Sequence, residues 1–418
     1  METKSRVDIF SLLLYICIAI VGIASVYSAT SEQGHYTLLQ ERSGKQIMWF
    51  GISIFIGIVI FLLNAKLFEV FSWYFYIGFM LLLVAVLVIG AEIKGARSWI
   101  LIGPFSLQPS EFAKYGATFG VASVISSIGF SWKKRNDLLK LVGVILLPMG
   151  LILLQGDAGS SLVFASFVIV FYREGLTPLI LILGLAAILV FVLTLVFGSL
   201  YFSVGVLLLF LVFFAFTYTN KKLLLPSGML VVLAILFSLS VQFLFDNVLQ
   251  DHQRKRIQVT LNLIEDNRGA GYNVNQSKIA IGSGGFSGKG FLNGSHTKGN
   301  FIPEQETDFI FCTIGEEGGW LVSSLTVVLF SAFILRLYHL ASRAKKKFKR
   351  IFIFSLASII FFHLLVNVGM TIGLMPVIGI PLPLVSYGGS SILAFGIFIF
   401  TALKMDATRD EDLKSTYE

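Results

Sequence analysis

Long apolar runs separated by short polar segments dominate this sequence. A helix needs roughly 20 residues to cross the hydrocarbon core of a bilayer, so a run of about that length predicts one transmembrane helix. The chain is therefore expected to be an all-α, polytopic integral membrane protein. About twelve spans are expected, near residues 8–28, 46–63, 70–90, 109–128, 139–155, 159–172, 179–198, 201–218, 225–246, 307–337, 351–373 and 388–404.

Composition excludes a soluble protein. Hydrophobic residues make up 56% of the chain and charged residues 13%, against about 45–50% and about 25% in soluble domains. The first apolar run is too long for a signal-peptide core and lacks a small-residue cleavage site, so we expect it to be retained. Cys17 and Cys312 lie in or beside apolar spans, which gives no basis for a disulfide framework.

The placement of Lys and Arg predicts the orientation of the chain. Basic residues concentrate on one side of the predicted spans, which the positive-inside rule assigns to the cytoplasm. Both termini are then cytoplasmic, including a short tail over residues 405–418, and the long loop over 247–306 faces outward. Because the net charge of +8 falls at loop ends, it fits topology and anionic lipid, and we expect no nucleic-acid partner. The residues that define the cytoplasmic side are Lys4, Arg6, Lys66, Lys133, Lys134, Arg135, Arg173, Lys221, Lys222 and a cluster over 343–350.

The stretch Phe301–Trp320 passes from the outward loop into an apolar span, and Asp308 lies at that boundary. A carboxylate with little water around it tends to have a raised pKa, which suits a general base. The alternative is that Asp308 only caps the start of its helix, where acids are favourable.

Two further outward segments carry polar residues beside predicted spans. In the segment Lys94–Lys114, Glu111 and Lys114 share one helix face, and a lipid-buried acid and base are expected to pair. The pair fits helix packing as well as catalysis. In the segment Gln155–Ser161, Asp157 fits either turn chemistry or a functional role.

The segment Gly373–Ser391 contains Pro376, Pro381 and Pro383, so it cannot be a regular helix. Non-helical backbone at membrane depth must be buried in protein or line a cavity. We therefore expect this segment to form part of a cavity wall.

The glycine-rich segment Ile279–Gly290 lacks the phosphate-loop pattern, because Gly290 follows Gly288-Lys289 where Ser or Thr is required. It is either a flexible connector or a backbone that approaches a ligand or the membrane closely. Glu316 and Glu317 are expected to pack against a cation or backbone donor, with a proton path as the alternative. His363 and Asn367, four residues apart in one span, share a face and are expected to form an interhelical hydrogen-bonding pair.

Four spans begin on the outward side, near Pro109, Ser160, Asp308 and Gly388. Their helix N-termini present positive dipole ends and free N–H groups there. Together with Arg97 and the cations of the loop, they predict a receptor for an anion such as a phosphate group at the lipid surface.

Five motifs resemble those of the bacterial shape, elongation, division and sporulation (SEDS) polymerases, the family that includes RodA and FtsW. They are KGARSWILIGPFSLQPSEFAK, GDAGSS, GYNVNQSKIAIGSGGFSGKG, FIPEQETDFIFCTIGEEGG and PVIGIPLPLVSYGGSS, in the family's order between residues 94 and 391. The third is similar to the RodA branch. The family has a core of ten spans. In residues 179–246 the sequence predicts three spans where the family has one, so this chain is expected to have two additional helices.

The resemblance implies a single membrane glycosyltransferase domain over 1–418 that polymerises lipid II into peptidoglycan at the outer face of the bacterial inner membrane, during elongation and shape maintenance. Its partners would be lipid II, a polyprenyl-pyrophosphate-linked glycan, a class B penicillin-binding protein and other elongation-complex proteins. Asp308 would be the essential acid, acting as a base or holding a divalent cation (Mg or Mn); no other cofactor is expected. A lipid II flippase is the rival function. The supporting or substrate-binding residues would be Arg97, Gln108, Glu111, Lys114, Asp157, Lys278, Lys289, Glu304, Ser386 and Tyr387.

Overall fold

The computed structural model describes residues 7–31, 42–93, 95–103, 105–219, 221–247, 251–261, 263–264, 270–299 and 301–409. Ten of the helices described there are long and apolar enough to cross a membrane, which confirms the all-α, polytopic fold. They are α1 (Ile9–Thr30), α2 (Arg42–Leu62), α4 (Ser72–Ile89), α6 (Arg135–Leu154), α9 (Pro178–Phe197), α10 (Ser199–Thr217), α11 (Lys221–Asn247), α15 (Ile310–Arg343), α16 (Lys347–Thr371) and α17 (Gly389–Ala407).

The other two predicted spans are also helical. One is α5 (Pro109–Ser126), and the other is a succession of short helices, α7 (Ala158–Leu162), η1 (Val163–Ser166) and α8 (Phe167–Arg173). Because neither meets the same criteria of length and hydropathy, the count of twelve spans stays a prediction.

The chain forms two compact units. One contains residues 1–175 and 273–418, and the other contains residues 176–272. The second unit consists of α9, α10, α11 and α12 (Asp251–Thr260); within it, Thr194 of α9 donates a hydrogen bond of 2.8 Å to Ser238 of α11. The region in which we expected an added pair of helices therefore folds as a unit of its own.

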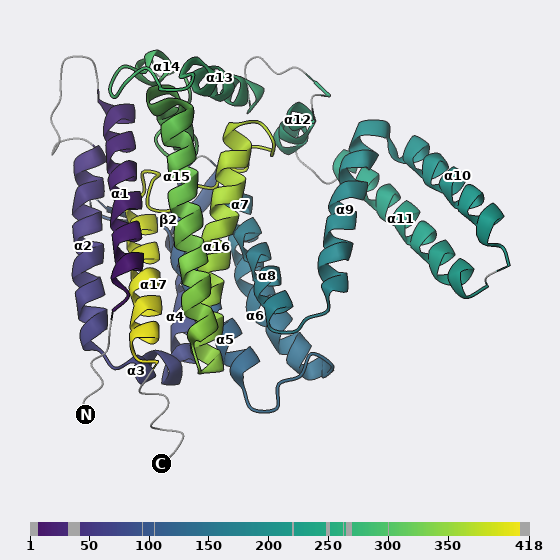
Figure 1. Cartoon of the computed structure of the whole chain (residues 1–418), viewed down its shortest axis with the longest axis horizontal. Coiled ribbons are helices and arrows are strands. Elements are labelled where there is room, and N and C mark those ends of the chain that lie inside the picture. Colours follow the sequence, from purple (N-terminus) through teal and green to yellow (C-terminus); the bar gives the residue numbers. More distant parts are fainter. Residues whose placement is uncertain are drawn as a thin grey trace. The chain divides into compact units, whose positions relative to one another are not determined.

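Helices α5, α16 and α17 form the buried centre of the larger unit, whose long helices run side by side in Figure 1. Nearly every residue of α5 is buried, and so are most residues of α16 and α17. Tyr115 and Phe119 of α5 meet Phe352 of α16 and Phe398 of α17, with ring centroids 4.9–5.8 Å apart in the contacts between helices. Helices α1, α2, α4, α6 and α15 surround this centre, so the polar residues of α5 and α16 are shielded from lipid.

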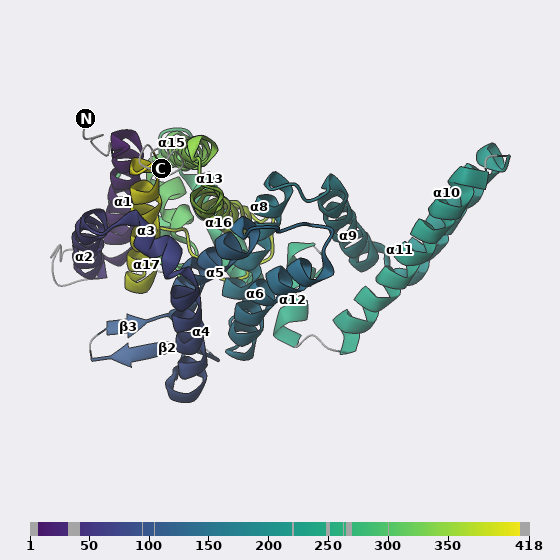
Figure 2. The same ribbon diagram turned by 90° about the horizontal axis from the view of Figure 1, so that it is seen from below.

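Three short strands, which we did not predict, connect α4 to α5. The strands β1 (Ala91–Ile93), β2 (Ala96–Ile102) and β3 (Phe105–Leu107) form an antiparallel sheet in the order β1-β2-β3. Glu92 pairs with Arg97, and Ile100 pairs with Leu107. Positive φ angles at Gly95 and Gly103 allow the turns. Figure 2 shows the β2–β3 hairpin beside α4.

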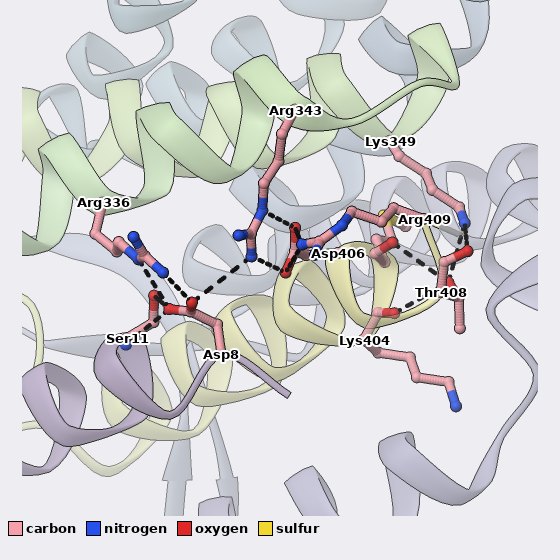
Figure 3. Close-up of polar contacts among 10 residues, drawn as sticks. Asp8, Ser11, Arg336, Arg343, Lys349, Lys404, Asp406, Thr408 and Arg409 are labelled. Carbon is pink, nitrogen blue, oxygen red and sulfur yellow. Dashed lines mark hydrogen bonds and ion pairs between the residues drawn. The ribbon is translucent and has the colours of Figure 1, made fainter. Parts of the chain in front are cut away.

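The first residues of α1 and the last residues of α17 lie at the same end of the larger unit (Figure 3). Asp8, which caps α1, is paired with Arg336 of α15, and Arg343 of α15 is bonded to Asp406 of α17 at 2.8 and 2.5 Å. Hydrogen bonds from Arg336 and Ser11 outweigh the effect of burial and hold the pKa of Asp8 well below its usual range. Asp308 precedes the opposite end of α15, so it lies at the other end of the bundle.

The predicted outward loop over 247–306 also contains α13 (Ala270–Ser283) and α14 (Ser295–Lys298). The small helix α3 (Ala65–Val70) connects α2 to α4.

Candidate active site

Asp308 lies two residues before the first residue of α15. The next residue, Phe309, is the N-cap of that helix. The side chain is half-buried. Gly379, with φ +78°, faces it, and a Cβ at that glycine would lie 3.2 Å from Asp308 Oδ2. Only a residue without a side chain both adopts this backbone conformation readily and leaves space beside the carboxylate.

The main chain of Asp308 is held from α16. The side-chain amide of Asn367 donates to Asp308 O at 2.9 Å and to Ile380 O at 2.8 Å. One turn earlier, His363 Nδ1 lies 2.8 Å from Pro381 O. The two side chains share a helix face, and each bonds to groups outside α16, as the predicted interhelical bonding requires.

The predicted ion pair between Glu111 and Lys114 is present in the buried interior. Lys114 Nζ is 2.8 Å from Glu111 Oε1 and 3.1 Å from His363 Nε2, and less than a tenth of each of these side chains is exposed. A lysine ammonium has no acceptor, so Nε2 of His363 accepts and Nδ1–H donates to Pro381 O. A chain of bonds thereby connects the ion pair to the segment that faces Asp308.

The starts of α5, α7 and α17 converge, which the sequence left open. The backbone N–H of Gln108 donates to Ser390 Oγ at 3.1 Å, and the Gln108 side-chain amide donates to Asp157 Oδ2 at 3.2 Å. Asp157 also caps α7 by accepting from Ser160 N at 2.9 Å. Ser110 and Ser160 lie 3.5 Å apart. Asp157 therefore has the predicted turn role and also links two helix starts.

The segment from Leu382 to Tyr387 is fixed directly to the residues before Asp308. Ser386 Oγ donates to Thr307 O at 2.6 Å, and Tyr387 N donates to Glu306 O at 2.8 Å. Residues 372–388 contain no helix, which confirms the prediction made from their prolines.

Three other predicted site residues are exposed and lie in different elements. Arg97 is the second residue of β2, and its backbone N–H donates to Gln155 O at 2.8 Å. Lys278 of α13 lies along Gly373, at the start of the non-helical segment. Glu304 has φ +60° and accepts a hydrogen bond from Thr307 Oγ1 at 3.2 Å.

Lys289 is bonded to α15. Its Nζ lies 2.7 Å from Glu316 Oε1, which confirms that Glu316 packs against a cation. The glycine-rich segment before it approaches α15 so closely that a Cβ at Gly284 would lie 2.1 Å from Gly315 O. The segment thus approaches the backbone of a helix of the same chain, a partner that differs from the ligand or membrane we expected.

Among the residues that the structure describes, no cluster of three or more His, Cys, Asp or Glu side chains is arranged to hold a metal ion. The donor set around Asp308 therefore does not fit a cation held by protein ligands alone. The reaction proposed below therefore assigns no role to Mg or Mn.

Sequence reasoning did not identify Asn367, His363 or Gly379 as site residues. A signal for the first two was present: two polar side chains, four residues apart, occur in an otherwise apolar span. In lipid such residues need polar partners, and the partners here belong to a segment whose path the sequence does not give.

Comparison with known proteins places these features in a family. The model of the FTSW_RODA_SPOVE family, described as "Cell cycle protein", matches residues 6–203 and 181–410. The peptidoglycan glycosyltransferase MrdB of Escherichia coli K12 is 32% identical over 399 residues, covering 94% of this chain and 93% of that protein. The peptidoglycan glycosyltransferase RodA of Treponema pallidum is 32% identical over 418 residues, covering 93% and 94%.

Solved structures agree. One chain, from "Structural coordination of polymerization and crosslinking by a peptidoglycan synthase complex", has a TM-score of 0.72 at 25% identity and covers 97% of this chain and 98% of its own. The rod shape determining protein RodA of Thermus thermophilus has a TM-score of 0.61 at 22% identity, with the same coverage, and shares the fold. The chain therefore belongs to the FtsW, RodA and SpoVE family of cell cycle proteins.

Proposed function

We propose that this protein, a peptidoglycan glycosyltransferase of its family, polymerises lipid II into glycan strands, with Asp308 as the general base. The observation that carries the proposal is the way α16 and the non-helical segment over 372–388 fix this one carboxylate-bearing residue. Asn367 bonds its main chain, Ser386 and Tyr387 bond the two residues before it, and Gly379 leaves space beside its side chain. A fixed carboxylate that no side chain at Gly379 covers suits proton transfer to a positioned substrate.

The proposed reaction is a displacement at an anomeric carbon. The acceptor sugar hydroxyl oxygen forms the new glycosidic bond, its proton passes to the Asp308 carboxylate, and the bond from the anomeric carbon to the pyrophosphate oxygen breaks. The leaving group is polyprenyl pyrophosphate. Arg97 and Lys278 are exposed cations, and we assign them to the stabilisation of the charge that develops on the pyrophosphate. The starts of α5, α7 and α17, which converge on Gln108, add backbone dipoles of the same sign.

We place this site at the outer face of the bacterial inner membrane, with both termini in the cytoplasm. Two features support the placement: the ends of α1 and α17 that lie nearest the termini share the end of the bundle opposite Asp308, and the basic residues of the short loops predict that this end is cytoplasmic. A class B penicillin-binding protein is the proposed partner. A related structure bears the description of a synthase complex that couples polymerisation and crosslinking, and other elongation-complex proteins would join this pair.

Purified protein in detergent, supplied with lipid II alone, tests the proposal. We expect glycan polymers that a muramidase degrades, because a glycosyltransferase needs no second compartment. If the protein forms no polymer in detergent but moves lipid II between the leaflets of sealed vesicles, the flippase function replaces this one.

A further inference from the structure

The long helix α15 is broken at Gly319. This residue has φ +64° and ψ −163°, and a Cβ there would lie 2.3 Å from the backbone nitrogen of Gly288. A break in a membrane helix frees backbone groups that must find other partners. In this helix the partners come from the glycine segment, which we define as residues 284–290.

The glycine segment replaces the missing helical hydrogen bonds on both sides of the break. The N–H groups of Lys289 and Gly290 each donate, at 3.0 Å, to the carbonyls of Glu316 and Glu317 respectively. Beyond the break, Trp320 N donates to Gly285 O at 2.9 Å and Leu321 N donates to Phe286 O at 3.1 Å. The Phe286 and Trp320 rings stack with centroids 5.4 Å apart. The glycine segment is therefore part of the framework of α15.

The carboxylate of Glu316 anchors the residues that follow the glycine segment. Its Oε1 accepts from Lys289 Nζ at 2.7 Å, Ser295 Oγ at 3.2 Å and His296 N at 2.9 Å. Its Oε2 accepts from Thr297 N and Thr297 Oγ1, each at 2.8 Å. The Glu316 side chain is 0% exposed, and every contact just given is made by a donor.

The anchored residues lead to Asp308. Thr297 O accepts from Gln305 Nε2 at 2.9 Å, and the same amide donates to Ala29 O at 3.0 Å. Tyr387 N then bonds Glu306 O. The path from Glu316 to the residues before Asp308 is thus a series of direct bonds.

We propose that Glu316 is a positioning residue for polymerisation: it holds residues 289–297 on the broken helix, and this anchorage fixes the segment that carries Asp308. Lys289 serves the same anchorage by neutralising a buried carboxylate. The proposal rests on the function proposed for Asp308 and gives the glycine-rich motif a structural purpose.

Two adjacent glutamates provide a matched pair of variants. Both carboxylate oxygens of Glu316 accept hydrogen bonds, and Glu316→Gln replaces one of them with an NH2 group that cannot accept. The variant therefore loses contacts although the shape of the side chain is kept. In Glu317→Gln the remaining oxygen still accepts from Ser28 Oγ and Gly294 N, which both bond Glu317 Oε1. Thr297→Val removes only one hydroxyl bond to Glu316 and provides a milder variant should Glu316→Gln fail to fold.

The experiment measures hydrogen exchange over residues 285–298 and steady-state polymerisation of lipid II, both on the purified full chain. For Glu316→Gln we expect faster exchange and a kcat about 10- to 100-fold lower with KM little changed, because misplacement of a catalytic group acts on the chemical step. Thr297→Val should show the same pattern to a smaller extent, and Glu317→Gln should match the wild type. Normal exchange or a normal kcat in Glu316→Gln would overturn the proposal, as would a change confined to KM.

Variants of Lys289 provide a second test. If it acts only through Glu316, Lys289→Met should lower kcat less than Glu316→Gln does, and the double variant should equal Glu316→Gln. Multiplied effects with a raised KM would show that Lys289 binds substrate independently. Absence of polymer from the wild-type protein would contradict the proposed function instead, and the exchange data would still test the anchorage.

Discussion

Asn367 holds Asp308 by its main chain: the side-chain amide lies 2.9 Å from Asp308 O and 2.8 Å from Ile380 O. One buried side chain thus joins the residue that we assign as the base to the non-helical segment that faces it. The position of the carboxylate depends on this bond even though the carboxylate itself is not part of it.

We expect Asn367→Leu to lower the polymerisation rate while the protein remains inserted in the membrane. The change leaves two buried carbonyls without this donor, and each such loss costs about 1–3 kcal/mol. Thr371→Val is the control, because Thr371 is buried in the same helix and its hydroxyl bonds only to Val368 O within α16. In steady-state kinetics, Asn367→Leu should have a lower kcat than Thr371→Val. Equal kcat values in the two variants would refute the positioning of Asp308 by Asn367.

Asp308→Asn should abolish polymerisation without disturbing the fold. The amide has nearly the same shape but cannot accept a proton at neutral pH. The change also leaves in place the bonds from Asn367 to Asp308 O and from Ser386 to Thr307 O. Lipid II polymerisation and thermal unfolding in detergent give the two readouts. Glycan synthesis at close to the wild-type rate would remove Asp308 from the catalytic role.

The sequence predicted the membrane spans, the buried ion pair and the irregular proline segment, because each depends on local pattern or on the high cost of unpaired charge in lipid. It did not predict which carbonyls Asn367 and His363 would bond. Those partners, Asp308 O, Ile380 O and Pro381 O, are backbone groups from other segments, and backbone carbonyls are the same in every sequence. The strands over 91–107 were not predicted because their apolar residues look like the end of a transmembrane span. Only the turns at Gly95 and Gly103, which have positive φ angles, divide this stretch into strands.

The buried pair of Glu111 and Lys114 should show strong coupling. Either single replacement by Leu leaves one buried charge without its partner, which typically costs about 3–5 kcal/mol. The double replacement removes both charges, so we expect it to yield more folded protein than either single variant. Thermal unfolding followed by size-exclusion chromatography measures this. Single effects that simply add would show that the two side chains do not stabilise each other, despite their separation of 2.8 Å.

At the opposite end of the bundle, Asp406→Ala should lower stability without changing catalysis. The Asp406 side chain is 0% exposed and accepts from Arg343 and Arg409, so its loss removes charge-assisted hydrogen bonds at a cost of about 1–3 kcal/mol. The pair of Lys346 and Glu69 is more exposed, and its removal should cost about 0–1 kcal/mol. Unfolding temperatures distinguish the two, and the rate per folded molecule should stay constant in both.

The unit over residues 176–272 gives the last prediction, which concerns topology. Helices α9, α10 and α11 have 20, 19 and 27 residues, and at a rise of about 1.5 Å per residue each is long enough to cross the hydrocarbon core. If all three span, the turn at Gly198 faces outward and the connection after α10 faces the cytoplasm. Asn220, at the centre of that connection, lies outside the described residues, so Thr219 serves as the probe.

Single cysteines at Ser199 and Thr219, in a background without Cys17 and Cys312, can be treated with a membrane-impermeant thiol reagent on intact cells. The number of spans here must be odd, because the segment of Asp157 and the loop over 247–306 are both predicted to face outward, with the short helices α7, η1 and α8 returning the chain to the cytoplasm at Arg173. One span would also satisfy this parity, but it cannot contain the long, mostly apolar stretch over 179–246, so we expect three. The basic Lys221 and Lys222 beside the second probe favour the cytoplasm as well. We therefore expect the cysteine at 199 to be labelled and the cysteine at 219 to be protected until the membrane is permeabilised. Labelling of the cysteine at 219 from outside would exclude the twelve-span topology and favour the ten-span layout, in which the region of α9, α10 and α11 crosses the membrane once.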